Sequence, residues 1–144
     1  MKRKIISFVS LLATTLLCAF CMFSCDPPDY YFLKVTANVE SKEDILVIQL
    51  IELDEPASLM QVMRKLELDK KFEFEDKDGM VTKIGNKANT ANSYWMLYTS
   101  DEEMSDTSWR SYTYNDEIFG LGNFGANNLT AVKGETYIWV YESF

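Results

Sequence analysis

The 144-residue sequence contains no histidine, and it has only three cysteines, six glycines and three prolines. The absence of histidine excludes Ser-His-Asp and Cys-His catalytic triads, His-ligated zinc sites and a histidine-based pH switch. A chain of this length has room for one modest domain and a short additional segment, so large multidomain enzymes are also excluded.

Basic residues are scarce beyond the N-terminus. Lys2, Arg3 and Lys4 are basic, and no acidic residue precedes Asp26. From residue 25 onward the sequence holds 11 basic and 22 acidic side chains, a net charge of −11. A surface this acidic repels nucleic acid and anionic lipid headgroups. We therefore expect no nucleic-acid partner.

The N-terminal segment has the pattern of a secretory signal. Its basic start is followed by an apolar run from Ile5 to Phe23 and by a polar break at Asp26-Pro27-Pro28-Asp29, where proline ends any helix. We predict a signal peptide over 1–24, an anchor and short linker over 25–32, and one domain over 33–144. An uncleaved spanning helix is the alternative, because the apolar run approaches the roughly 20 residues that a bilayer requires.

The cysteines favour a lipid anchor. Met22-Phe23-Ser24-Cys25 resembles a bacterial lipobox, which implies that Cys25 is diacylated and becomes the first residue of the mature chain. The lipobox prefers Leu where Met22 stands, and Cys21 fits less well because Phe20 precedes it. Cys18 is the remaining cysteine, so a domain cleaved before Cys25 would hold no disulfide. Since two acyl chains attach a protein stably, we expect a lipid-anchored protein on the extracytoplasmic face of the cell membrane.

The hydrophobic pattern predicts an α+β domain. Tyr31 to Val39 alternates in the manner of a half-buried strand, and Ile45 to Leu53 is nearly unbroken, as expected for a strand covered on both faces. Residues 40–44 form a polar connection of hairpin length. One helix follows, for which Ser58 and Gln61 fit a capping box. Its apolar stripe consists of Leu59, Val62, Met63 and Leu66.

The second half adds further strands. Asp78-Gly79 predicts a hairpin between Phe72–Phe74 and Val81–Ile84. Ser93 to Thr99 is rich in aromatic strand formers. Gly134 to Glu142 alternates, with Thr136, Ile138 and Val140 on one face and Tyr137, Trp139 and Tyr141 on the other. The stretch from Asp101 to Asn128 shows no clear periodicity, and we expect an irregular loop there.

Four segments occur in a recognisable order: Ser58-Leu59-Met60, then Gly79 to Gly85, then Tyr94-Trp95-Met96-Leu97-Tyr98, then Lys133 to Tyr141. Together they resemble a bacterial domain-of-unknown-function family similar to the C-terminal β-domain of transcobalamin and intrinsic factor. The resemblance covers most of Leu33 to Phe144. It implies a small, mostly antiparallel sheet packed on one helix in a β-grasp-like arrangement, in an exported or surface-anchored protein.

The resemblance also implies a ligand. In transcobalamin the vitamin is held between this β-domain and a helical barrel, so cobalamin or another corrinoid is the ligand implied here, with a partner protein completing the site. A His–cobalt bond is impossible because the chain has no histidine. This sequence departs from the family at Thr99-Ser100-Asp101, where Asn-Gly is usual, and in the length of 101–131.

Aromatic side chains are the candidate ligand contacts, since 17 of the 120 residues from Cys25 onward are aromatic. Aromatic rings offer large contact areas, and their polar groups can also form hydrogen bonds. For residues in regular strands, core packing is the competing interpretation, whereas Phe119 and Phe124 join the candidates of the irregular segment, where functional contacts concentrate. The selected set is Trp95, Tyr98, Trp109, Tyr112 and Trp139.

Acidic residues give no metal prediction. Asp76 and Asp78 precede Gly79 as in a calcium loop, but an EF-hand needs an oxygen ligand where Phe74 stands, so a charged turn is expected. The acidic cluster Asp101, Glu102, Glu103 and Asp106 is interpreted as a solvated loop, with weak calcium binding as its alternative.

Catalysis has little support. A hydrolase using paired carboxylates is conceivable, but 22 carboxylates give no basis for choosing two. Gly120 to Gly125 lacks the spacing and context of a phosphate-binding loop. We predict a binding module that is not an enzyme and has no cofactor, with a corrinoid as its ligand. The alternative is a structural or adhesion-type domain that recognises a surface protein or envelope polymer.

Overall fold

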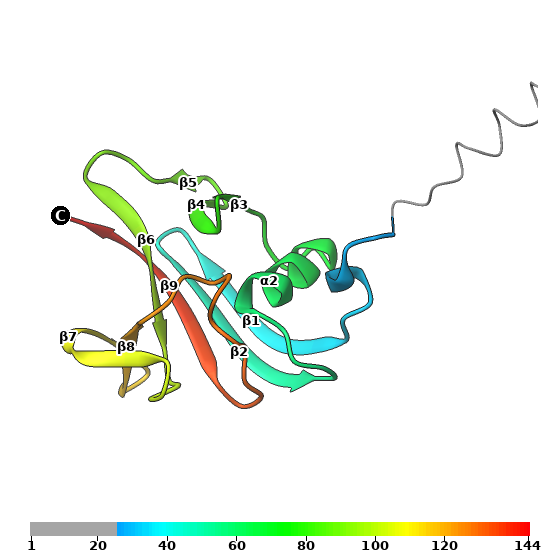
Figure 1. Ribbon diagram of the computed structural model, residues 1–144. Coiled ribbons are helices and arrows are strands. Elements are labelled where there is room, and N and C mark those ends of the chain that lie inside the picture. Colours follow the sequence, from blue (N-terminus) through cyan, green and yellow to red (C-terminus); the bar gives the residue numbers. More distant parts are fainter. Residues whose placement is uncertain (1–25) are drawn as a thin grey trace, which may run out of the picture.

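The strands form two antiparallel sheets in the computed structural model, which describes residues 26–144 (Figure 1). The predicted signal peptide and Cys25 lie outside the described residues. The larger sheet has the order β1-β2-β9-β6-β8-β7 and the smaller the order β3-β4-β5. In chain order the elements are η2 (Asp29–Tyr31), β1 (Val35–Lys42), β2 (Ile45–Leu53), α2 (Leu59–Leu68), β3 (Phe74–Lys77), β4 (Met80–Ile84), β5 (Lys87–Ala88), β6 (Ser93–Thr99), β7 (Ser105–Tyr114), β8 (Glu117–Gly122) and β9 (Thr136–Ser143).

The predicted mostly antiparallel sheet with one α-helix is confirmed for residues 26–144. The first strand was placed too early, because residues 29–31 form the short 3₁₀-helix η2 and β1 begins only at Val35. The expected connection over 40–44 was too long. Both strands continue until Lys42 faces Ile45, which leaves a two-residue turn.

The capping box of α2 is confirmed. The amide of Gln61 donates to Ser58 Oγ at 3.2 Å, and the amide of Ser58 donates to Gln61 Oε1 at 2.8 Å. These reciprocal bonds satisfy two groups that a helix N-terminus otherwise leaves unpaired. The predicted apolar stripe is buried, together with Met60.

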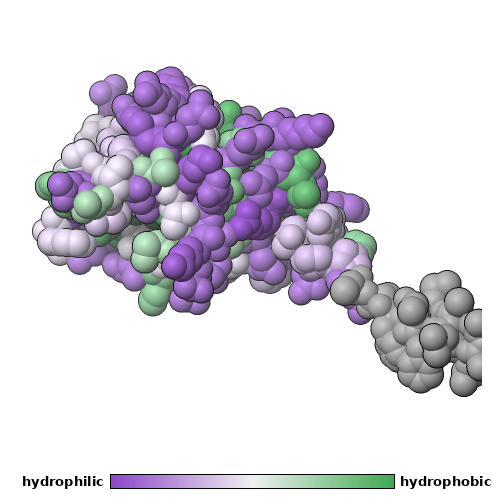
Figure 2. All heavy atoms as spheres, turned by 90° about the horizontal axis from the view of Figure 1, so that it is seen from above, coloured by the Kyte–Doolittle hydropathy of each residue, from purple (hydrophilic) through white to green (hydrophobic). Residues whose placement is uncertain are grey.

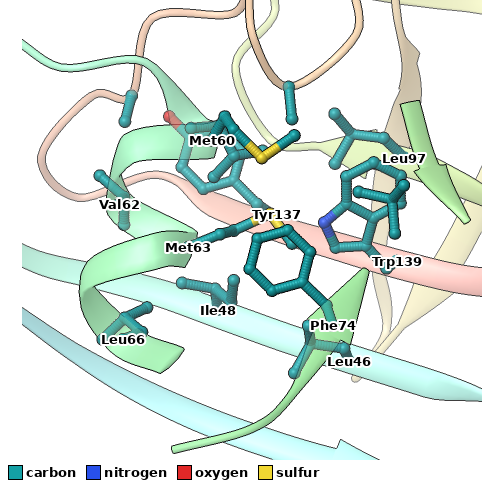
Figure 3. Packing of buried hydrophobic residues seen from close by; sticks show 14 of the residues in the cluster. Leu46, Ile48, Met60, Val62, Met63, Leu66, Phe74, Leu97, Tyr137 and Trp139 are labelled. Carbon is teal, nitrogen blue, oxygen red and sulfur yellow. The ribbon is translucent and has the colours of Figure 1, made fainter. Parts of the chain in front are cut away.

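The main core lies between α2 and one face of the larger sheet (Figure 3). Leu46 of β2 pairs with Trp139 of β9, and Ile48 pairs with Tyr137. All four side chains belong to this core. Phe74 of β3 packs into the same cluster, so the smaller sheet covers this face as well. The alternation predicted for β9 is confirmed, because Ile138 and Val140 belong to a separate cluster on the other face.

The larger sheet curls until its two edge strands approach each other. The second cluster joins Val47 and Ile138 from the middle of the sheet with Phe119 of β8 and, at its margin, Tyr112 of β7. At the end of β7, the hydroxyl of Tyr114 donates to a carboxylate oxygen of Glu40 in β1. Seen from above, hydrophilic side chains cover most of the visible surface (Figure 2).

The expectation of an irregular loop over Asp101 to Asn128 was wrong, since β7 and β8 form a hairpin within it. The hairpin turns through Asn115 and Asp116, whose φ angles are +50° and +65°. Two residues in the left-handed region match the right-handed twist of the flanking strands. β7 is an edge strand with a bulge between Asp106 and Ser111, so hydrophobic alternation is confined to its end, where Tyr112 and Tyr114 face the second cluster.

Candidate functional site

A cleft of about 480 Å³ opens between the smaller sheet, strand β6 and the segment that follows β8. Residues 78–81, 95–97 and 121–128 and Trp139 line it, and we call it the asparagine cleft. Its contributors come from four separate parts of the chain, so only the folded domain assembles it. Concave sites with apolar walls and a few polar groups are typical of small-molecule binding.

The N-terminus of α2 holds the outer wall of the cleft in place. The amides of Leu59 and Met60, which the helix itself cannot satisfy, donate to the carbonyl oxygens of Leu129 and Ala126 at 2.8 and 3.0 Å. Ala126 and Leu129 are themselves buried. Because these donors are already used, the helix end offers no free anion-binding amides at these two positions.

The turn between β3 and β4 touches this wall closely. Gly79 has a φ of +82°, and a Cβ atom placed there would lie only 2.0 Å from Asn127 Nδ2. Glycine suits this position for two reasons. It adopts the positive φ angle without strain, and it has no Cβ atom to clash with the Asn127 side chain. The predicted Asp78-Gly79 hairpin thus also forms part of the cleft.

The polar groups of the asparagine cleft are amides and one carboxylate. Asn123, Asn127 and Asn128 supply carboxamides that both donate and accept hydrogen bonds, and Asp78 is the single ionisable side chain among the lining residues. No lysine or arginine lines the cleft. This composition fits a neutral ligand with amides or hydroxyls and disfavours an anion.

Phe124 and Met80 supply the accessible apolar surface, since they are 51% and 65% exposed. Trp95 and Trp139 form the inner wall and are nearly buried. The ring of Trp95 lies 5.3 Å from that of Tyr141, and its Nε1 donates to the Lys87 carbonyl oxygen at 2.8 Å. Both tryptophans are therefore core residues that also reach the cleft.

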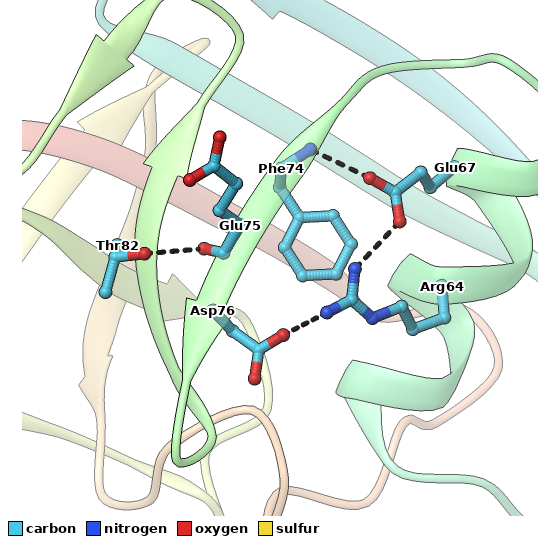
Figure 4. Close-up of polar contacts among 6 residues, drawn as sticks. All are labelled: Arg64, Glu67, Phe74, Glu75, Asp76 and Thr82. Carbon is cyan, nitrogen blue, oxygen red and sulfur yellow. Dashed lines mark hydrogen bonds and ion pairs between the residues drawn. The ribbon is translucent and has the colours of Figure 1, made fainter.

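The β3–β4 hairpin is tied to α2 by Arg64 (Figure 4). The guanidinium of Arg64 lies 4.2 Å from the centre of the Phe74 ring and donates to Glu67 at 2.8 Å and to Asp76. Glu67 in turn accepts a bond from the Phe74 amide at 3.1 Å. These contacts fix the strand that leads to the Asp78-Gly79 turn, and thereby the position of one cleft wall.

Tyr98 and Tyr112 lie on the opposite face of the sheet from the cleft. Their ring centres are 5.6 Å apart, and Tyr98 is fully buried. The Tyr98 hydroxyl donates to Glu142 at 2.7 Å, and Glu142 also pairs with Arg110. Burial, followed by the hydrogen bond to Glu142, raises the pKa of Tyr98 to about 12. Both side chains pack in the second cluster.

Trp109 lies neither in the asparagine cleft nor in the second cluster. It lies in a bulge of β7, where the register passes from Asp106 opposite Leu121 directly to Ser111 opposite Gly120. The side chain is 74% exposed. Its neighbour Arg110 turns back toward the sheet, where the guanidinium lies 4.5 Å from the centre of the Phe144 ring. The structure therefore divides the five aromatic candidates among three locations.

Sequence reasoning missed the asparagines of the cleft. The segment 123–128 carried a recognisable concentration of asparagine and glycine, but its path depends on the amides of α2, which lie some 65 residues earlier in the sequence. Phe124 is among the candidate contacts of the irregular segment, but it is not in the selected set. No sequence pattern joined these residues to Trp95 and Trp139.

Within residues 26–144, no group of three or more acidic or cysteine side chains is arranged to hold a metal ion. No helix in this range combines the length and apolarity needed to cross a bilayer. Comparisons of the whole chain with family models, curated proteins and solved structures give no match.

Proposed function

We propose that this protein is a lipid-anchored, extracytoplasmic binding module and not an enzyme, and that its ligand occupies the asparagine cleft. The observation that carries the proposal is the convergence of three carboxamides, one carboxylate and an exposed phenyl ring on a single concavity without cationic side chains. Such a site selects neutral molecules that present hydrogen-bonding groups around an apolar face.

A corrinoid is the ligand that we propose within this class, as the resemblance implies in a β-grasp-like domain. The rim of a corrin carries amide side chains, which complement the amides of Asn123, Asn127 and Asn128. A cleft of about 480 Å³ would take one edge of such a ligand. A partner protein would cover the rest.

The test is isothermal titration of the full chain, extracted from membranes in detergent, with cobalamin and with cobinamide, while tryptophan fluorescence is followed. We expect saturable binding with quenching, because Trp95 and Trp139 line the cleft. Phe124→Ala should weaken binding by about tenfold or more, through the lost ring contact. Ile118→Ala is the matched control, since Ile118 is an exposed apolar residue outside the cleft.

No binding of either compound up to millimolar concentration would contradict a corrinoid site on this chain alone. Equal loss of affinity in the Phe124 and Ile118 variants would contradict the assignment to the asparagine cleft.

Trp109 favours a second candidate function, an adhesion-type interaction with a surface protein or envelope polymer. Its side chain is 74% exposed and lies apart from the cleft. The next residue, Arg110, is held in place by an ion pair with Glu142. Exposed tryptophans frequently dominate the energy of protein interfaces. Trp109→Ser should abolish such an interaction while leaving corrinoid titration unchanged.

A further inference from the structure

An exposed aromatic segment stands next to the proposed anchor. Tyr31 and Phe32 are 48% and 67% exposed, and the rings of Tyr30 and Tyr31 stack with centres 4.9 Å apart. We call residues 30–32 the aromatic step. They belong to η2 or follow it directly, and η2 packs against α2, so the segment is attached to the domain.

The distance to the anchor is short. Asp29 follows Cys25 after only three intervening residues, and a fully extended chain spans about 14 Å over these four residue steps. Pro27 and Pro28 restrict this connection further, and Pro28 has the extended angles φ −52° and ψ 144°. If Cys25 carries acyl chains, the aromatic step is held at the membrane surface whatever the orientation of the rest of the domain.

The chemistry of the aromatic step suits that position. Tyrosine and other aromatic side chains concentrate at the boundary between headgroups and acyl chains, where apolar rings are buried and polar edges stay hydrated. Figure 2 shows pale and apolar side chains around the point where the described chain begins. The charged side chains nearby in the sequence are Asp26, Asp29 and Lys34, which give this segment only a small net negative charge, although the domain as a whole is acidic.

We propose that the aromatic step inserts Tyr31 and Phe32 into the interfacial region of the bilayer and so fixes the orientation of the domain on the membrane. The inference rests on the lipid anchor of the proposed function. The occupant of this surface is a bilayer of zwitterionic lipid, because a strongly anionic surface would repel the acidic domain. In this orientation β7 and β8, which lie at the far side of the molecule from η2 in Figure 1, remain away from the lipid.

The experiment uses the full chain with Cys18→Ala and Cys21→Ala, into which a single labelling site is introduced as Phe32→Cys or as Ile118→Cys. Phe32 and Ile118 are matched in exposure, at 67% and 68%, so neither substitution disturbs the core. The purified, acylated proteins are labelled with a nitrobenzoxadiazole maleimide and reconstituted into vesicles of phosphatidylcholine and phosphatidylethanolamine. Flotation is measured first, and then quenching by lipids that carry a nitroxide on the headgroup.

We expect flotation of both proteins, and a fall of about twofold or more in the emission of the label at position 32, since interfacial insertion places it among the quenchers. The label at position 118 should lose almost none of its emission. Equal quenching at the two positions, or a blue-shifted but unquenched label at 32, would overturn the inference; the latter would indicate a protein contact instead of lipid. Failure to float would overturn the anchor and the inference together, whereas flotation with an unquenched label at 32 would overturn the inference alone.

Discussion

Trp95 and Trp139 are diagonal neighbours on β6 and β9, and only Trp95 has a partner for its indole nitrogen. Trp95 Nε1 donates to the Lys87 carbonyl oxygen at 2.8 Å, whereas the buried Trp139 Nε1 has no acceptor among the described residues. In Figure 3 the Trp139 nitrogen is turned toward Tyr137 and Phe74, within the apolar core.

This difference predicts unequal costs for the same substitution. Trp95→Phe and Trp139→Phe remove equal volumes, but only the first leaves the partly buried Lys87 carbonyl without this donor, while the second eliminates an unsatisfied N–H group. Trp95→Phe should therefore lower the free energy of unfolding by about 1–2 kcal/mol more than Trp139→Phe. Urea denaturation measures both values, and equal costs would show that Trp139 Nε1 is satisfied in solution.

A second prediction concerns the turn that borders the cleft. Gly79 and Gly85 both have positive φ angles, +82° and +54°, so alanine at either position costs about 1–2 kcal/mol in backbone strain. Only the Cβ atom at position 79 would meet Asn127, because position 85 has nothing within 4 Å. Gly79→Ala should therefore displace the Asn127 side chain and weaken ligand binding, while Gly85→Ala should leave affinity unchanged. Amide chemical shifts and titration would report the two effects, and an undisturbed Asn127 in Gly79→Ala would contradict the close approach.

The Arg64 contacts predict that lysine at this position stabilises the fold less than arginine does. Its planar guanidinium reaches Glu67 and Asp76 simultaneously and covers the Phe74 ring, which a lysine ammonium cannot do. Arg64→Lys should lower the free energy of unfolding by about 1 kcal/mol, a modest value because the side chain is partly exposed. Lys77→Arg is a charge-conserving control at an exposed position. A change in the Arg64 variant no larger than in this control would show that the bridge contributes nothing to stability.

Alkaline pH should destabilise the protein through two buried tyrosines. Burial raises the pKa of both Tyr98 and Tyr137 to about 12, above the ordinary value of 10.0. Below pH 10 both states keep these protons, so the contribution to stability is complete. Between about pH 10 and 12 the unfolded chain loses them while the native state retains them, and the free energy of unfolding must fall.

Denaturation curves recorded from pH 9 to 12 would show this decline. Tyr98→Phe and Tyr137→Phe should each make it shallower, since phenylalanine has no proton to lose. A slope unchanged in both variants would place its origin elsewhere.

The fold was predictable wherever local chemistry and tertiary packing agree. Ser58 and Gln61 correctly predicted where α2 begins. The alternation of β9 correctly placed Tyr137 and Trp139 on one face of the sheet, and Ile138 and Val140 on the other. The β7–β8 hairpin was missed because a bulge breaks β7 and confines its alternation to a short stretch around Tyr112 and Tyr114. Glycine at position 120 of β8 also contributes nothing to a hydrophobic pattern. A Cβ atom there would lie 2.7 Å from Ser105 Oγ, so the close approach of the two strands favours glycine at this position.

The candidate site was predictable only in part. Trp95 and Trp139 were selected for their aromatic character, and they do reach a common cleft. The asparagines and Phe124 were not predicted as a site, because their place follows from hydrogen bonds between a late loop and the first turn of α2. Long-range pairing of this kind has no periodic signature in a single sequence.

The irregular edges of the larger sheet have a consequence for neighbouring molecules. β1 shifts register between Thr36 and Ala37, and β7 bulges between Asp106 and Ser111. A strand from another copy would find no long, even row of donors and acceptors along β7, so growth of one sheet into the next is obstructed at this edge. Under the proposed anchoring, many copies can then share a small area of membrane at high local concentration without fusing into fibrils.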